Sequence, residues 1–141
     1  MRKILSAVII LFLLAAVGYC ADAEKPNFTL YVSNQSLDIK QVDVKVYLDG
    51  KLVIDEMFDV KGQKVAQHNQ KAFYFRLSNG EHTIKVESKK GKAKLEQKFI
   101  IKDINWAVIN YWHSYKQERE GLEFGKRHFT FMIQDKPIGF D

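Results

Sequence analysis

The stretch QVDVKVYLDGKLV, from Gln41 to Val53, decides the fold. Its first half alternates strictly between apolar and polar or aromatic side chains, which is typical of a β-strand with one buried face. The apolar set is Val42, Val44, Val46 and Leu48. Asp49-Gly50 then supplies the residues of a tight turn, and a second apolar run follows. The stretch therefore predicts a β-hairpin with one face in the core.

The length of this turn determines which residues pair. A two-residue loop would place Val46 opposite Val53. A three-residue loop, with Gly50 in the left-handed region, would place Val46 opposite Leu52 and Val44 opposite Ile54. We favour the three-residue loop because it keeps more apolar side chains on one face.

Two further turn signals follow, Asn79-Gly80 and Lys90-Gly91. A two-residue loop at the first would pair Phe75 with Ile84, and the same loop length at the second would pair Val86 with Leu95. Residues 72–102 are therefore predicted as three meandering strands. Gly50 and Gly80 are both expected to have positive φ, which side chains with a Cβ adopt at a cost.

More strands are expected at residues 28–33, 105–115 and 128–134, and one short helix at 116–124. About eight short strands with turn signals between them predict an all-β chain. We expect an antiparallel β-sandwich of seven to eight strands, immunoglobulin-like or transthyretin-like, preceded by a signal peptide.

The densest aromatic stretch is INWAVINYWHSY, Ile104 to Tyr115. As a strand, its even-numbered face is the more apolar and is expected in the core, with both tryptophans buried. The odd-numbered face would then display Tyr111, His113 and Tyr115 on the surface. Aromatic planes stack on sugar rings, so these three side chains are the candidate ligand-binding platform; the alternative is that the stretch serves packing alone.

The N-terminus has the features of a secretory signal: Arg2 and Lys3, then an apolar run to Val17 and smaller residues. The run is shorter than the roughly 20 residues of a spanning helix, although an uncleaved anchor remains an alternative. Cleavage after Ala23, at an A-x-A site, is favoured over lipidation of Cys20, because bulky Tyr19 precedes that cysteine. We expect residues 1–23 to be the signal peptide and residues 24–141 to be a single β-sandwich domain.

The exported chain would have 118 residues and no cysteine, since Cys20 is the one cysteine of the sequence. Loss of Arg2, Lys3 and Asp22 lowers the formal net charge from +5 to +4. A domain of this size buries enough surface to fold without a disulfide or a metal. We therefore expect a mildly basic domain that is stabilised by an ordinary core.

No motif for catalysis or metal binding stands out, and no cofactor is expected. The histidines are not spaced for chelation, and the simpler interpretation places them at the surface or in turns; they are His68, His82, His113 and His128. No serine lies in a nucleophile motif. A basic hairpin could contact anionic polymers or lipid headgroups, or it could protect a strand edge against aggregation; its residues are Lys89, Lys90, Lys92 and Lys94.

The middle of the chain resembles small transthyretin-like and PEGA-like β-sandwich modules of exported bacterial proteins. The residues that carry the resemblance are VDVKVYLDGKLV, Val42 to Val53, and FRLSNGEHTIKV, Phe75 to Val86. The resemblance implies a non-catalytic module on an exported protein.

Together these features predict a non-enzymatic exported β-sandwich, an interaction or ligand-binding module of the cell envelope. The alternative is an accessory subunit or a small enzyme that acts on envelope glycans. The expected partner is a protein or glycan of the envelope and not nucleic acid, and membrane contact is expected only through a lipidated Cys20 or an uncleaved signal. The expected location is periplasmic or secreted, with lipid anchoring as the alternative.

Overall fold

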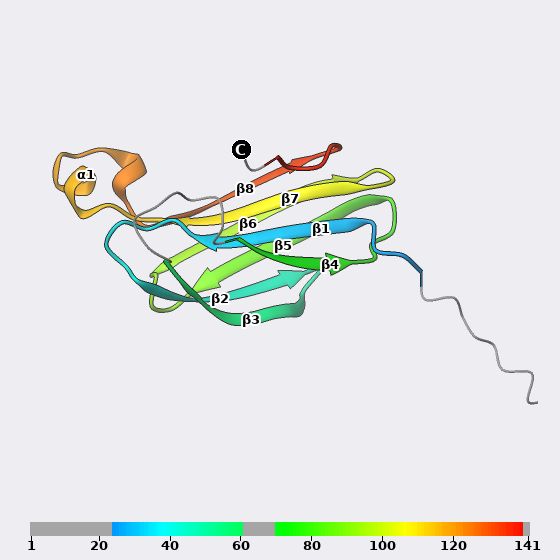
Figure 1. The fold of residues 1–141 in the computed structure, drawn as a ribbon, viewed down its shortest axis with the longest axis horizontal. Helices are drawn as coiled ribbons and strands as arrows, with labels where there is room; N and C mark the ends of the chain where they lie inside the picture. Colours follow the sequence, from blue (N-terminus) through cyan, green and yellow to red (C-terminus); the bar gives the residue numbers. More distant parts are fainter. Residues whose placement is uncertain (1–23, 61–69, 140–141) are drawn as a thin grey trace, which may run out of the picture.

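The structure is a computed structural model that describes residues 24–60 and 70–139. Two four-stranded sheets pack face to face in this part of the chain (Figure 1). The first sheet has the order β4-β1-β7-β8, with bounds Lys71–Phe75, Phe28–Asn34, Asn105–Trp112 and His128–Gln134. The second has the order β3-β2-β5-β6, with bounds Lys51–Asp59, Gln41–Leu48, Gly80–Ser88 and Ala93–Ile101. Only β1 and β7 pair in parallel among these strands. The predicted all-β sandwich is confirmed.

The hairpin of β2 and β3 has the predicted strands but not the predicted turn. Leu48 pairs with Lys51, so the loop is the two-residue Asp49-Gly50, and both residues have positive φ, 49° and 80°. A register shift next to Val46 then brings Ile54 opposite Val46. The prediction of a three-residue loop was wrong. The register shift is a β-bulge that returns Ile54 to the buried face, and the alternation of residues does not show it.

The expected pairing of Phe75 with Ile84 is also wrong. β4 pairs with β1 in the first sheet, Phe75 opposite Phe28, whereas β5 lies in the second sheet. Asn27 fixes the crossing segment, because its side chain donates to Leu77 O and accepts from Leu77 N, both at 2.8 Å. Gly80 has a φ of 123°, as predicted, but at a crossover between sheets and not in a hairpin.

The turn between β5 and β6 confirms its prediction, since Val86 pairs with Leu95. Gly91 is required here by space and not by a positive φ. A Cβ on Gly91 would lie 2.7 Å from both Ser88 Oγ and Tyr111 Cε2. The hydroxyl of Tyr111 donates to Gly91 O at 2.8 Å, so the first sheet supports the turn of the second.

The two faces of β7 are the reverse of the prediction. Ala107, Ile109 and Tyr111 are fully buried, whereas Trp112 is 39% exposed. Asn105 also lies inside, where its Oδ1 accepts from Lys102 N at 2.8 Å. The odd-numbered face of β7 can be the core face because the polar side chains of Asn105 and Tyr111 find hydrogen-bond partners there.

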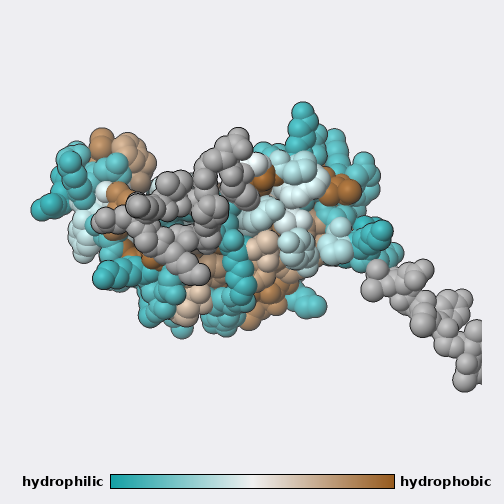
Figure 2. Space-filling model, in the orientation of Figure 1, coloured by the Kyte–Doolittle hydropathy of each residue, from teal (hydrophilic) through white to brown (hydrophobic). Residues whose placement is uncertain are grey.

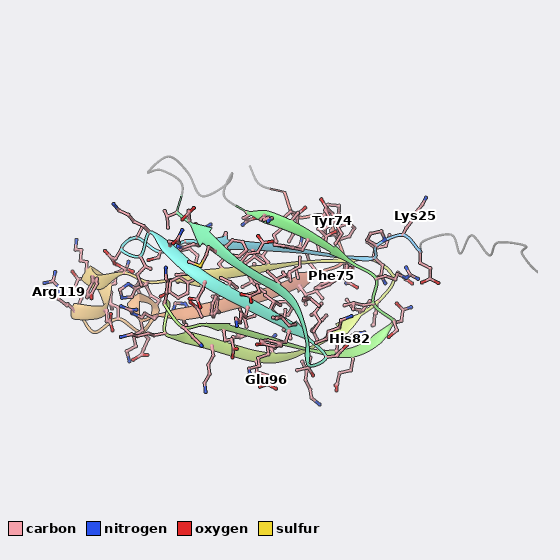
Figure 3. The ribbon with its side chains drawn as sticks, turned by 90° about the horizontal axis from the view of Figure 1, so that it is seen from below. Lys25, Tyr74, Phe75, His82, Glu96 and Arg119 are labelled. Carbon is pink, nitrogen blue, oxygen red and sulfur yellow. The ribbon has the colours of Figure 1, made fainter. Side chains whose placement is uncertain are left out.

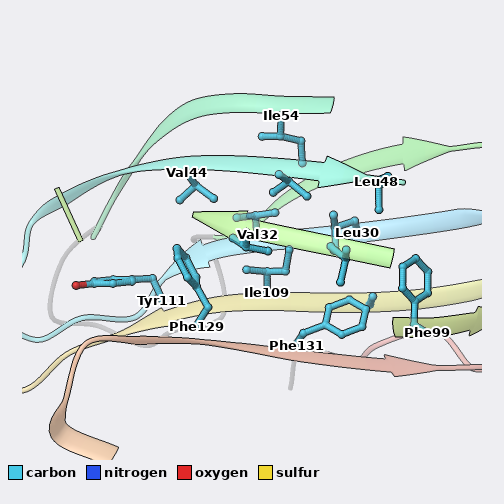
Figure 4. Close-up of a cluster of buried hydrophobic side chains, with 14 of the residues drawn as sticks. Leu30, Val32, Val44, Leu48, Ile54, Phe99, Ile109, Tyr111, Phe129 and Phe131 are labelled. Atoms are coloured by element: carbon cyan, nitrogen blue, oxygen red, sulfur yellow. The ribbon is translucent and has the colours of Figure 1, made fainter. Parts of the chain in front are cut away.

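The core lies between the sheets and receives side chains from both (Figure 4). Phe99 of β6 links the two layers, because its ring packs against Phe28 and Phe131 with centroids 5.5 Å away in each case. The alternating apolar residues of β2 are all buried, as the sequence predicts. Tyr111 closes one end of the core beside Phe129, with ring centroids 5.4 Å apart.

A short helical segment connects β7 to β8 at one end of the sandwich (Figure 1). It consists of α1, Tyr115–Arg119, and a 3₁₀ turn, η2, Glu123–Gly125, so the expected helix over 116–124 is confirmed in part. Gly121 separates the two with a φ of 79°. Across residues 24–60 and 70–139, no helix has the length and apolarity needed to cross a membrane.

Candidate functional site

The expected aromatic platform does not exist as one surface. Tyr111 is 0% exposed because it points into the core, and His113 is 2% exposed because it packs between Asp38 and Glu118. Only Tyr115 is exposed, at 55%. The outer-face placement of Tyr111 and His113 was therefore wrong. Burial also raises the pKa of the Tyr111 hydroxyl, which keeps it a neutral donor to Gly91.

A groove lies instead on the opposite, outer face of β7 and β8, where the segment of α1 and η2 forms one wall. We call it the outer-face groove. Its volume is about 530 Å³. Its lining combines apolar or aromatic side chains with neutral polar ones: Leu37, Asn110, Trp112, His113, Ser114, Gln117, Phe124, His128, Thr130 and Met132.

The floor of the groove is formed by side chains of β7 and β8 that alternation directs to the outer face. Trp112 in β7 lies on the outer face, and Thr130 of β8 accepts a hydrogen bond from the indole Nε1 at 3.4 Å. Met132 follows two residues later on the same face and is 67% exposed. Trp112 is thereby oriented by a neighbour while part of its ring stays accessible to a ligand.

His128 and Asn110 bring polar atoms to this floor, and each side chain keeps one nitrogen available to a ligand. His128 Nδ1 lies 2.7 Å from Lys126 O, and a carbonyl only accepts, so Nδ1 carries the proton. Nε2 has no hydrogen-bond partner in the described part of the chain. Asn110 Oδ1 accepts from Ser33 Oγ at 2.7 Å, which leaves the Asn110 amide nitrogen as a donor for a ligand.

The wall of the groove is held by His113. This side chain is fully buried, with Nε2 2.9 Å from Glu118 Oε2 and Nδ1 3.7 Å from Asp38 Oδ2. Asp38 Oδ2 also accepts from Tyr115 N at 2.5 Å. The contacts of His113 with Glu118 and Asp38 join α1 to the loop that follows β1. Within the described residues, His113 Nδ1 makes no hydrogen bond.

Close packing fixes the same wall. Ser114 caps α1, because its Oγ accepts from Gln117 N at 3.4 Å. Gly125 lies against the helix so closely that a Cβ there would be 2.4 Å from Glu118 N. Its carbonyl accepts from Ser114 N at 2.9 Å, so α1 and η2 form one compact unit.

Two of the histidines differ from the placement at the surface or in turns that the sequence suggested. His82 and His113 are both buried, and His68 lies outside the described residues. His82 Nδ1 lies 2.6 Å from Asp49 Oδ2 and Nε2 lies 2.7 Å from Ser78 O. Among residues 24–60 and 70–139, no group of three or more histidine, cysteine, aspartate or glutamate side chains is arranged for a metal ion.

The basic hairpin lies at the end of the sandwich that carries α1, and its four lysines, Lys89, Lys90, Lys92 and Lys94, are exposed as expected. Arg127 joins them from the other sheet, since its Nη1 donates to Lys90 O at 3.4 Å. Cys20 and the expected signal segment, residues 1–23, lie outside the described residues.

Most of the groove was missed at the sequence level. Met132 could have been found, because it lies on the polar side of the alternation that puts Phe129 and Phe131 inside. Leu37 lies in a loop and Phe124 in the short turn η2, where no periodicity shows that they line the same groove as Trp112.

Over the described residues, the chain is a β-sandwich of eight strands with a groove on one outer face. A scan against protein-family models and a search of curated proteins both find no match for it.

Proposed function

We propose that this protein is a non-enzymatic, exported β-sandwich that binds a neutral saccharide of the cell envelope in the outer-face groove. The observation that carries the proposal is the lining itself. Aromatic and apolar surfaces stand beside neutral amides and hydroxyls, and no Asp, Glu, Lys or Arg of the described residues lines the groove.

This combination suits a sugar ring. The apolar face of the ring stacks on Trp112 or Phe124, while its hydroxyls exchange hydrogen bonds with Asn110, Gln117 and His128 Nε2. A glycosidase would require a pair of carboxylates beside the bond to be cleaved. The two acidic side chains beside His113, Asp38 and Glu118, do not line the groove. The residue types therefore favour binding over hydrolysis.

Export is part of the proposal and is supported by the pattern of residues 1–23. We expect the mature protein to begin at Glu24, in the periplasm or outside the cell. The resemblance to transthyretin-like and PEGA-like modules is a further part of the proposal. It rests on the residue pattern of its two motifs. Val42 to Val53 forms the β2–β3 hairpin, whereas Phe75 to Val86 crosses from the first sheet to the second.

The groove is tested with a panel of neutral oligosaccharides, each titrated by calorimetry. We expect at least one to bind, and Trp112→Ala to weaken that affinity at least about tenfold, because a stacked aromatic anchor carries much of such binding. Trp106→Ala is the matched control, since Trp106 lies on the same face of β7 but outside the groove lining. No binding across the panel, or equal losses in both variants, would contradict the proposal.

A further inference from the structure

The turn between β5 and β6, which we call the lysine turn (Lys89 to Lys92, with Lys94 beside it), is rigid in its backbone. Asp43 accepts from Lys89 N at 3.1 Å, from Lys90 N at 2.8 Å and from Ser88 Oγ at 2.9 Å. Gly91 N donates to Ser88 Oγ at 2.8 Å. The turn therefore projects its lysine side chains from a fixed position.

These cations are not neutralised locally. Within the described residues, Lys89, Lys92 and Lys94 have no carboxylate partner within 4.0 Å. Five lysines elsewhere do have one, namely Lys45, Lys71, Lys85, Lys98 and Lys126. The other described lysines outside the lysine turn, such as Lys51 and Lys102, are unpaired but do not cluster in one turn. Lys92 also has a φ of 49°, a left-handed conformation that costs lysine more free energy than glycine. The positive charge of Lys89, Lys92 and Lys94 is therefore unpaired. Lysine occupies position 92 although the backbone conformation there favours glycine.

The acidic side chains near the turn are engaged elsewhere. Asp43 holds the turn itself, Glu87 pairs with Lys85, and Glu123 pairs with Lys126. Asp38 and Glu118 face His113. Glu120 is the remaining acidic residue of the α1 segment. Arg127 adds a positive charge beside Lys90. The charge at this end of the sandwich is therefore positive.

Exposed apolar side chains accompany the charge at the same end. Tyr115 and Leu122 of the α1–η2 segment are both exposed and do not line the groove, and Phe124 borders them. Figure 2 shows some apolar surface at the end that carries α1, as at other places on this face. The chain on either side of this segment contacts the lysine turn: the hydroxyl of Tyr111 in β7 donates to Gly91 O, and the guanidinium of Arg127, after η2, donates to Lys90 O.

We propose that this end of the sandwich docks on a bilayer rich in anionic phospholipid, with the lysine turn at the phosphates and Tyr115 and Leu122 in the interface. Charge complementarity favours an anionic surface. The apolar side chains favour a bilayer over a soluble polyanion, because only a bilayer offers an interface into which they can insert. Arg119 marks this docking end in Figure 3, and Lys25 lies toward the other end.

The test is cosedimentation of the exported protein with vesicles of phosphatidylcholine, alone or mixed with phosphatidylglycerol at roughly 3:1. We expect binding that requires phosphatidylglycerol and falls as salt rises from about 0.1 M to about 0.5 M. The triple substitution Lys89→Ser, Lys90→Ser and Lys92→Ser should weaken it about tenfold or more.

A matched control removes the same charge from the opposite end, through Lys51→Ser, Lys102→Ser and Lys136→Ser. It should retain most of the binding. Equal losses in the two triple variants, or binding that is indifferent to phosphatidylglycerol, would overturn the proposal. The lysine-turn variant should still bind saccharide in the groove, so the two proposals fail separately.

Leu122→Ser distinguishes a bilayer from a soluble polyanion. We expect it to weaken vesicle binding severalfold and to leave binding of soluble polyphosphate unchanged. If Leu122→Ser has no effect on vesicles while the lysine-turn variant loses vesicles and polyphosphate equally, the surface binds polyanions and the bilayer proposal is wrong.

Discussion

His82 occupies a position in which both ring nitrogens face acceptors, Asp49 and the carbonyl of Ser78. Burial opposes the charge on the ring, but these hydrogen bonds and the charge of Asp49 outweigh it and raise the pKa of His82. The hydrogen bond from His82, with that from Thr83 N, lowers the pKa of Asp49. The pair thus favours a protonated imidazole beside an ionised carboxylate.

The sign of the resulting pH dependence follows from the two shifts. The contribution of His82 to stability is complete below its ordinary pKa of 6.5 and is lost as pH rises through the raised value. The contribution of Asp49 is present above 3.8 and is lost as pH falls through the lowered value. We expect His82→Gln to destabilise the protein more at about pH 5 than at about pH 9. Urea unfolding at both values measures this, and an equal loss at both would show that the pair is not protonated.

Gly91 tests the close approach of the two sheets. Gly91→Ala places a methyl group against the ring of Tyr111, which is itself held by the core, so we expect a loss of about 1–3 kcal/mol in the free energy of unfolding. Gly139→Ala is the control, because no heavy atom lies within 4 Å of a Cβ there and φ is not positive. Similar denaturation midpoints for both variants would refute the contact.

At the scale of elements, Asp43 determines the shape of the lysine turn. Burial opposes its charge, but hydrogen bonds from Lys90 N, Lys89 N and Ser88 Oγ lower the pKa of Asp43, so the turn should loosen only as pH falls below the ordinary value of 3.8. Asp43→Ala should speed hydrogen exchange at the amides of Lys89 and Lys90 and leave the amides of β7 unchanged. Unaltered exchange in the turn would mean that Asp43 does not order it.

Alternation and turn residues were enough to find the strands, and they fixed the register where the contact is local, as between β5 and β6. They could not assign β4 to its sheet, because the contact that decides it joins Leu77 to Asn27, 50 residues earlier. The prediction of which face of β7 is buried was wrong for the same reason. The Tyr111 hydroxyl donates to Gly91 O and His113 Nε2 lies 2.9 Å from Glu118 Oε2, and no pattern along β7 shows those partners.

At the scale of the whole molecule, the proposed export determines the compartment in which we expect the groove to bind its ligand. We expect intact-mass spectrometry of the protein from its native host to give a chain beginning at Glu24, because Ala21-Asp22-Ala23 fits the cleavage pattern and Tyr19 disfavours lipidation. A diacylglyceryl increment on Cys20 would instead show an anchored protein.

The central claim is that the surface around Trp112 binds a neutral saccharide, and acrylamide quenching of tryptophan emission tests it most directly. Trp106→Phe leaves Trp112 as the one tryptophan, and its 39% exposure predicts ready quenching in the free protein. A saturating concentration of an oligosaccharide from the calorimetric panel should then protect Trp112 and reduce the quenching constant. Quenching that is unchanged while the oligosaccharide is bound would place the binding site elsewhere and contradict the account.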